Sequence, residues 1–246
     1  TIMMTKTQKK SKKKKSKTKK TKDDMNNTSN TNFSSDNITI TNFDHIGGKD
    51  ADETRRDLLR LRDNDPVLTE LQWTHRKVST EGGKAVAEML MTNTTVHTLY
   101  IGSNNIGVEG GKAMAEMLKV NKILHTLYIG HNNIGDEGGK AMAEMLKVNT
   151  TLRILDIGCN NFYAEGRKAM AEMLKVNTTL HELYIYNNEI SAKGGKAMAE
   201  MLKVNTALHT LDIRYNNIGV EGAKAVAEML MTNTTVHTLN ITDNKC

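Results

Sequence analysis

A chain of 246 residues with a formal net charge of +6 suggests a basic protein, but the charge is unevenly distributed. Residues 1–22 hold 11 lysines and no acidic side chain, so the rest carries 23 basic against 28 acidic side chains, a net charge of −5. We expect neither a secretory signal nor a membrane span, because no apolar segment follows the basic N-terminus and no apolar run approaches ~18–20 residues. The 2 cysteines cannot form a disulfide framework, so we expect a reducing compartment, the cytoplasm or the nucleus.

The first segment, residues 1–36, consists largely of Lys, Thr, Ser and Asn. It holds too little apolar surface to offset the entropy of ordering, so we expect it to be disordered. Its lysines fit a nuclear localisation signal, a sequence-independent contact with nucleic acid or an anionic membrane, or a solvated linker, and the residues leave these three open. The basic positions are Lys9, Lys10, Lys12, Lys13, Lys14, Lys15, Lys17, Lys19, Lys20 and Lys22.

The second segment, residues 37–66, has a different pattern. "ITITNF", residues 38–43, alternates like a strand, and "DADETRRDLLRLRDND", residues 50–65, begins with acidic residues and stops before Pro66, as a helix does. A divergent strand and helix ahead of a repeat array is typical of a cap, because the first repeat has no neighbour to cover its face. We therefore predict an N-terminal capping strand and helix over residues 37–66.

The third segment, residues 67–246, repeats itself. Variants of "EGGKAMAEMLKVN" begin 28 residues apart without insertion or deletion, and a fixed period of this size predicts a solenoid. The Gly-Gly-Lys in this motif does not predict a phosphate loop, because such a loop needs a Gly where Ile106 stands and a Ser or Thr where Ala113 stands. The six variants begin at Glu81, Glu109, Glu137, Glu165, Lys193 and Glu221.

Each unit combines a strand pattern with a helix pattern. The apolar residues Leu99 and Ile101 are two apart, on one face of a short strand that precedes Asn104. Met114 and Leu118 then follow helical spacing. We therefore predict an α/β fold with one strand and one helix per unit, six full units and a truncated seventh.

These motifs resemble leucine-rich repeats of the ribonuclease-inhibitor-like subclass, which also form the C-terminal part of NOD-like receptors. The resemblance covers residues 67–246 and implies a horseshoe, with parallel strands on the concave face and helices on the convex face. It further implies a sensor or regulatory role, although fold alone does not determine function. A related architecture occurs in GTPase-activating proteins, a minor alternative here because the chain has no distinctive loop arginine or acidic tail.

Several repeated residues have structural interpretations. Gly110 and its equivalents are expected to let each helix approach the strand layer closely. One asparagine series, which includes Asn121 and Asn149, lies at the helix ends, where a left-handed conformation is expected. A second series should form an inward amide ladder that satisfies buried backbone groups, although Arg76 takes its place in the first unit. The ladder comprises Asn104, Asn132, Asn160, Asn188, Asn216 and Asn244.

The strand residues between the apolar positions differ most from unit to unit, so we expect a partner there. Five of the 6 tyrosines lie at these positions, and tyrosine and arginine are common anchors of protein interfaces. A simpler interpretation is that tyrosine suits a strand surface. The candidate partner-binding residues are Tyr100, Tyr128, Tyr184, Tyr186, Tyr215, His97, His125, Arg153, His181, His209, Asp156, Asp212 and Arg214.

A basic column crosses this face and comprises His97, His125, Arg153, His181, His209 and His237. Because neighbouring strands lie ~4.8 Å apart, adjacent imidazoles could meet. A metal ladder would need convergent geometry and usually a carboxylate or thiolate; a pH-sensitive binding face is a second interpretation, and a surface position copied by duplication is the third. Cys159 lies on the same face, and we assign it no catalytic role.

The sequence thus predicts a non-catalytic scaffold, without cofactor or metal, that binds a protein partner on its concave strand face. No catalytic dyad or triad is recognisable. The alternative from another class is a nuclear protein that binds a polyanion or nucleic acid through the lysine-rich tail, with the repeats as a scaffold.

Overall fold

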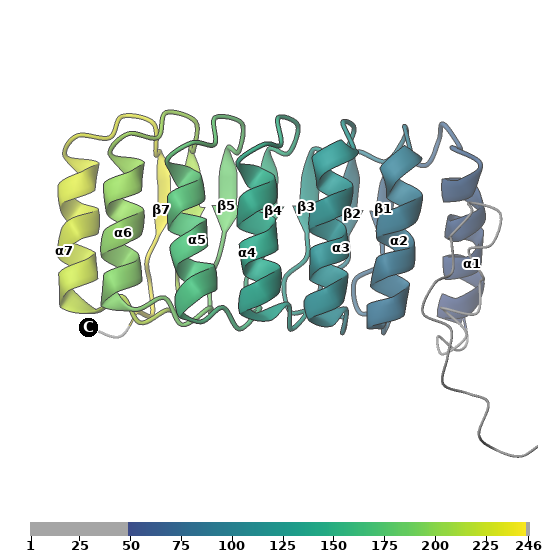
Figure 1. Ribbon diagram of the computed structural model, residues 1–246, viewed down its shortest axis with the longest axis horizontal. Helices are drawn as coiled ribbons and strands as arrows, with labels where there is room; N and C mark the ends of the chain where they lie inside the picture. Colours follow the sequence, from purple (N-terminus) through teal and green to yellow (C-terminus); the bar gives the residue numbers. More distant parts are fainter. Residues whose placement is uncertain (1–48, 245–246) are drawn as a thin grey trace, which may run out of the picture. The chain divides into compact units, whose positions relative to one another are not determined.

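A computed structural model describes residues 49–244 of the chain (Figure 1). The helices are α1 (Lys49–Arg62), α2 (Thr80–Thr92), α3 (Gly107–Val120), α4 (Gly135–Leu146), α5 (Ala164–Leu174), α6 (Ala192–Leu202) and α7 (Gly219–Leu230). The strands are β1 (Glu70–Gln72), β2 (Thr98–Tyr100), β3 (Thr126–Tyr128), β4 (Ile154–Asp156), β5 (Glu182–Tyr184), β6 (Thr210–Asp212) and β7 (Thr238–Asn240). Among these residues no helix is long and apolar enough to cross a bilayer.

The strands form one parallel sheet in chain order, β1 to β7, and the helices form a second layer on one side of it (Figure 1). Each strand pairs with the next at a shift of 28 residues, so that Leu99 lies opposite Leu127 and Leu127 opposite Leu155. Parallel strands lie ~4.8 Å apart, whereas packed helices need ~8–10 Å. Each coil is therefore wider on its helix side, which makes the strand side concave. The predicted fold class, an α/β leucine-rich-repeat solenoid with parallel strands, is confirmed.

The core lies between the two layers and repeats from coil to coil. In the second coil Leu99 and Ile101 of the strand segment and Met114 and Leu118 of α3 are fully buried. These are the positions that the period of two and the helical spacing assigned to the interior. The methionines fill the space between strand and helix, a use that suits their flexible, unbranched side chains.

The buried asparagine series joins each coil to its neighbours. Asn160 is fully buried, and its Nδ2 donates to the carbonyl oxygens of Ile157 and Gly158 in its own coil and of Ile129 in the preceding coil, at 3.1–3.2 Å. Its Oδ1 accepts from the backbone N–H of Asn132 at 3.0 Å. A primary amide both donates and accepts, so one side chain satisfies the backbone of two coils. Equivalent contacts occur at Asn104, Asn132, Asn188, Asn216 and Asn244.

The asparagines at the helix ends differ from the prediction in conformation. Asn121 has φ −65° and ψ 129°, an extended rather than a left-handed backbone. Its side chain explains the choice of residue: Oδ1 accepts from the N–H groups of Ile123 and Leu124 at 2.8 Å, and Nδ2 donates to the carbonyl oxygen of Leu90 at 2.7 Å. The residue thus caps the end of the helix in the preceding coil and fixes the turn into the next strand. The expectation of a left-handed conformation was wrong for Asn121.

Helices α2, α3, α4 and α6 carry two adjacent glycines near their start, and most of these lie against an isoleucine and not, as predicted for Gly110 and its equivalents, against the strand layer. A Cβ at Gly138 would lie 2.1 Å from Cγ2 of Ile134 in the same coil. A Cβ at the second glycine, Gly111, would lie 2.6 Å from the same Ile134 atom, across the boundary to the preceding coil. The first glycine therefore makes room for the isoleucine of its own coil. The second glycine lets the helix of its coil approach the next coil closely. In α5 the second glycine is replaced by Arg167, and residues of α5 and α6 line a cavity of about 170 Å³.

Helix α1 covers the first coil. Leu58 and Leu61 are buried, Trp73 Nε1 donates to Asp57 Oδ2 at 2.9 Å, and Arg76 forms an ion pair with Glu53. The segment predicted as a helix over residues 50–65 is thus a helix that ends at Arg62. The strand predicted at residues 38–43 and the lysine-rich tail lie outside the described residues.

Candidate binding surface on the strand face

The candidate surface is the side of the sheet opposite the helices, which we call the strand face. Because the strands pair in register, equivalent positions form rows that cross the sheet from β2 to β7. The central row is Tyr100, Tyr128, Asp156, Tyr184, Asp212 and Asn240. The row toward the strand starts is His97, His125, Arg153, His181, His209 and His237, and the row beyond the strand ends is Gly102, Gly130, Gly158, Tyr186, Arg214 and Thr242.

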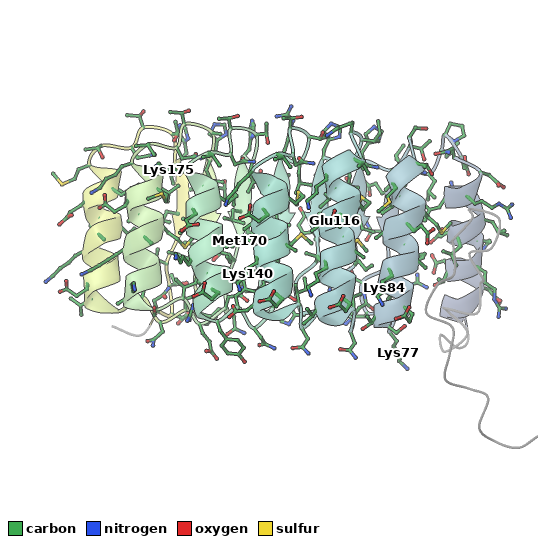
Figure 2. The ribbon with its side chains drawn as sticks, in the orientation of Figure 1. Lys77, Lys84, Glu116, Lys140, Met170 and Lys175 are labelled. Carbon is green, nitrogen blue, oxygen red and sulfur yellow. The ribbon has the colours of Figure 1, made fainter. Side chains whose placement is uncertain are left out.

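The helix side is uniform by comparison. Figure 2 views this side, with Lys84, Glu116 and Lys140 labelled on α2, α3 and α4. These side chains form ion pairs three residues along their own helices, such as Lys84 with Glu81 at 2.9 Å. Exposed pairs of this kind contribute little to stability, and repeated charge pairs carry little information that would distinguish one partner from another. The variation between coils is on the strand face.

The central row begins with a pair of stacked tyrosines. The rings of Tyr100 and Tyr128 lie 4.7 Å apart between centroids and are parallel to within 2°. The distance equals the strand spacing, so the register of β2 and β3 sets the stack directly. Both residues are half-buried, so part of the stacked aromatic pair is open to solvent.

Three carboxylates occupy the middle of the face. Asp212 is buried (6% exposed) and lies 3.1 Å from Arg214 Nε. Asp156 Oδ1 accepts from the Gly158 N–H at 3.0 Å, and the Tyr186 hydroxyl donates to its Oδ2 at 3.4 Å. Burial raises the pKa of Asp156 above its ordinary value, since a carboxylate loses hydration there.

Glu182 is the third of these carboxylates, and sequence reasoning left it out of the candidate site. The Tyr184 hydroxyl donates to Glu182 Oε2 at 2.7 Å. That hydrogen bond, followed by burial, raises the pKa of the Tyr184 phenol far above its ordinary range. Glu182 occurs where Thr98, Thr126 and Thr210 stand in other coils, and this change from threonine to a carboxylate is the signal in the sequence that could have identified it.

A second cluster lies at the strand ends. The Tyr186 ring covers Gly158, where a Cβ would lie 2.5 Å from the ring, so the glycine is required by this contact. The Arg214 guanidinium lies 5.1 Å from the Tyr186 centroid and 6.0 Å from that of Tyr215, within range of a cation–π attraction. Burial raises the pKa of Tyr186 to about 12. A cavity of about 330 Å³ is lined by His131, Cys159, Tyr186, Asn187, Arg214 and Tyr215.

The hydrogen-bond partner of Cys159 in this cavity is an amide and not a base. Its Sγ accepts a hydrogen bond from Asn187 Nδ2 at 3.2 Å, and burial raises the thiol pKa. A thiol whose pKa is raised is a poor nucleophile, because the thiolate is the reactive form. The geometry thus gives no reason to assign catalysis to this residue.

The histidine column is in contact along most of its length. His97 and His125 stack with centroids 5.6 Å apart, whereas His209 lies edge-on to His181 and His237, at 5.0 and 5.7 Å. Burial, followed by the neighbouring His97 and Arg153, lowers the pKa of His125. Over residues 49–244 no group of three or more His, Cys, Asp or Glu side chains could hold a metal ion.

The repeated coil, the asparagine ladder and the in-register strand face are the features of a leucine-rich repeat, and the sequence matches the family model described as "Leucine Rich repeat" over residues 92–115, 120–143, 148–171, 176–199 and 204–227. The chain is a leucine-rich repeat protein, and its 28-residue strand–helix units are of the ribonuclease-inhibitor-like type. The curated proteins include no match to it.

Among solved structures, the chain is similar to one titled "Leiomodin-1 Actin-Binding Site 2 (ABS2)". That match has 27% identity and a TM-score of 0.55, and covers 61% of this chain and 87% of the other. The tropomodulin C-terminal domain of Caenorhabditis elegans matches at 17% identity and a TM-score of 0.46, covering 73% of this chain and 92% of that one. An internalin from Listeria monocytogenes matches at 17% identity and a TM-score of 0.43, covering 73% of this chain and 49% of that one.

Proposed function

We propose that the chain is a non-catalytic protein-binding module that uses the strand face as its contact surface. The observation that carries the proposal is the uneven distribution of variable and aromatic side chains between the two sides of the solenoid. The strand face presents a parallel tyrosine stack and an arginine that lies beside two further tyrosine rings. Rigid aromatic and arginine side chains supply most of the binding energy in many protein interfaces, because little entropy is lost when they are fixed.

The same contacts support a preformed surface. The Tyr100 and Tyr128 rings are held by strand register, and Tyr186 is held between Gly158 and Arg214. A surface that does not reorganise on binding loses less free energy to ordering, which favours affinity. Specificity would then come from the differences between coils along each row. A sensor or regulatory role, as in NOD-like receptors, is part of this proposal and rests on family resemblance.

Actin is the first defined partner to test, because the leiomodin-1 structure that resembles this chain carries actin binding in its title. The assay is sedimentation or pull-down of the purified 246-residue chain with actin, together with affinity capture from a lysate of its source. The test variant changes Tyr100, Tyr128 and Tyr184 to Ala, and a matched control changes Lys112, Lys140 and Lys196 on the helix side to Ala. We expect the tyrosine variant to lose capture and the lysine variant to keep it.

Folding and the tail need separate controls. Tyr100→Phe with Tyr128→Phe keeps both rings in place, so a protein that binds through the stack should keep most of its capture. Deleting residues 1–35 tests the alternative function, in which the lysine-rich tail binds a polyanion. If that alternative is correct, the deletion should abolish capture, and capture by the undeleted chain should weaken steeply as the salt concentration rises. Capture that is retained after the deletion would exclude the tail as the binding element. Unchanged capture by a folded tyrosine variant would exclude the strand face as the contact surface.

A further inference from the structure

The middle of the strand face has an unbalanced charge. Asp156, Glu182 and Asp212 lie on the neighbouring strands β4, β5 and β6. Tyr184 lies between Asp156 and Asp212 in the central row, and Glu182 precedes Tyr184 by two residues on β5. Asp212 is paired with Arg214, but none of the ion pairs within residues 49–244 includes Asp156 or Glu182. A partly buried carboxylate without a counter-charge is costly, because protein replaces the water that would solvate it. A cation supplied from outside the chain would remove that cost.

Two tyrosine rings flank this charge. Strand register places Asp156 directly between Tyr128 and Tyr184 in the central row. The two tyrosines are thus two strand steps, ~9.6 Å, apart, with a shorter side chain between them. On its other side Tyr128 is covered by the Tyr100 ring, so the face turned toward Asp156 is the one left to a ligand.

A cation seated above Asp156 would lie ~4.8 Å from each tyrosine, inside the ~6 Å range of a cation–π attraction. The Asp156 carboxylate forms the floor, and the Tyr184 hydroxyl holds the Glu182 carboxylate nearby. A carboxylate below and a tyrosine on each side suit the elongated side chain of a lysine or arginine, whose alkyl stem packs on the rings while its charged end meets the oxygens. A carboxylate-bearing side chain would be repelled at the same place.

We propose that the slot formed by Tyr128, Asp156, Tyr184 and Glu182 receives a lysine or arginine side chain of the protein partner. The proposal rests on the proposed function and assigns the chemistry of one anchor point on that surface. It predicts that the partner presents a basic residue to β4 and β5, and that binding weakens as salt increases.

The test uses a defined peptide, so that it does not depend on the partner's identity. Acetyl-Gly-Ser-Lys-Ser-Gly-amide is titrated into the full chain, and its arginine, norleucine and glutamate analogues are titrated in parallel. Binding is followed by chemical-shift changes of the Tyr128 and Tyr184 rings. We expect the lysine or arginine peptide to bind at least about five-fold more tightly than the norleucine peptide, which has the stem without the charge. Equal binding of the norleucine peptide, or no binding of any, would overturn the proposal.

The variants are Asp156→Asn and Glu182→Gln, which keep side-chain shape and can keep the hydrogen bonds from Gly158 and Tyr184. Together they should weaken the basic peptide about five-fold or more. Asp243→Asn, an exposed carboxylate of the same face beyond β7, is the matched control and should change nothing. If the Asp156 and Glu182 variants bind both the peptide and a captured partner as before, while the tyrosine variant loses the partner, the proposed function stands and this inference fails.

Discussion

Replacing Asn160 with alanine should test whether the amide ladder holds the coils together. The substitution leaves the N–H groups of Asn132 and Ile134 without their acceptor and removes one of the donors to three carbonyl oxygens, around a fully buried side chain. An unsatisfied buried group costs about 1–3 kcal/mol. With two N–H groups fully orphaned and the carbonyls partly so, we expect a loss of about 3–5 kcal/mol in the free energy of unfolding.

The assay is urea unfolding followed by far-UV circular dichroism, with Asn244→Ala as the matched control. Asn244 makes the same type of contacts but is partly exposed, so water can replace them and the loss should be about 1 kcal/mol. With an m-value of about 3 kcal/mol/M, the Asn160 variant should shift the midpoint by roughly 1–1.7 M. Equal midpoint shifts for the two variants would refute the reasoning, because burial would then make no difference to the cost.

Three further predictions follow from the fold and the strand face. Arg153→Ala removes a positive neighbour and should raise the pKa of His125, measured by NMR titration; an unchanged value would show that Arg153 does not contribute to it. Because the folded-state pKa of His125 is lowered, the unfolded chain binds more protons at low pH. The stability of the protein should therefore fall as the pH drops below about 6.5, and this loss should be smaller in the Arg153 variant. Gly138→Ala should destabilise the protein by about 1–3 kcal/mol through its contact with Ile134, despite the higher helix propensity of alanine, and a stabilised variant would contradict this. Strand β7 forms an edge of the described sheet, so its amides should exchange with solvent faster than those of β4, and equal protection in hydrogen exchange would be the contrary result.

The parts of the structure that repeat could be predicted from the sequence. A constant 28-residue period fixes the register of the sheet, so Leu99 and Leu127 were bound to lie side by side, and Tyr100 and Tyr128 with them. The period of two in the strands and the helical spacing in the helices likewise separated core positions from surface positions. The period is informative because each of the six units shows the same pattern of apolar and polar residues, so the pattern is not a coincidence of one segment.

The contacts between unlike coils were beyond such reasoning. Tyr186 crosses from its own coil to cover Gly158, and Arg214 then lies beside its ring; neither residue has an equivalent from which its direction could be inferred. Backbone conformation was also misjudged where side-chain hydrogen bonds decide it. Asn121 suggested a left-handed turn, but its amide instead satisfies an extended one. The lysine-rich tail and its proposed role remain a prediction.

The replacement of the second glycine by Arg167 has a consequence for how the array unfolds. In a solenoid each coil is stabilised chiefly by its two neighbours, so the total stability is a sum of couplings between adjacent coils. Where Gly111 permits close contact with the adjacent coil, the coupling is strong; at α5 a long side chain occupies that position and a cavity separates residues of α5 and α6. We expect the array to behave as two cooperative blocks joined at this boundary, with β5 as the seam. Force or denaturant applied to the chain would then separate the two blocks before either one melts.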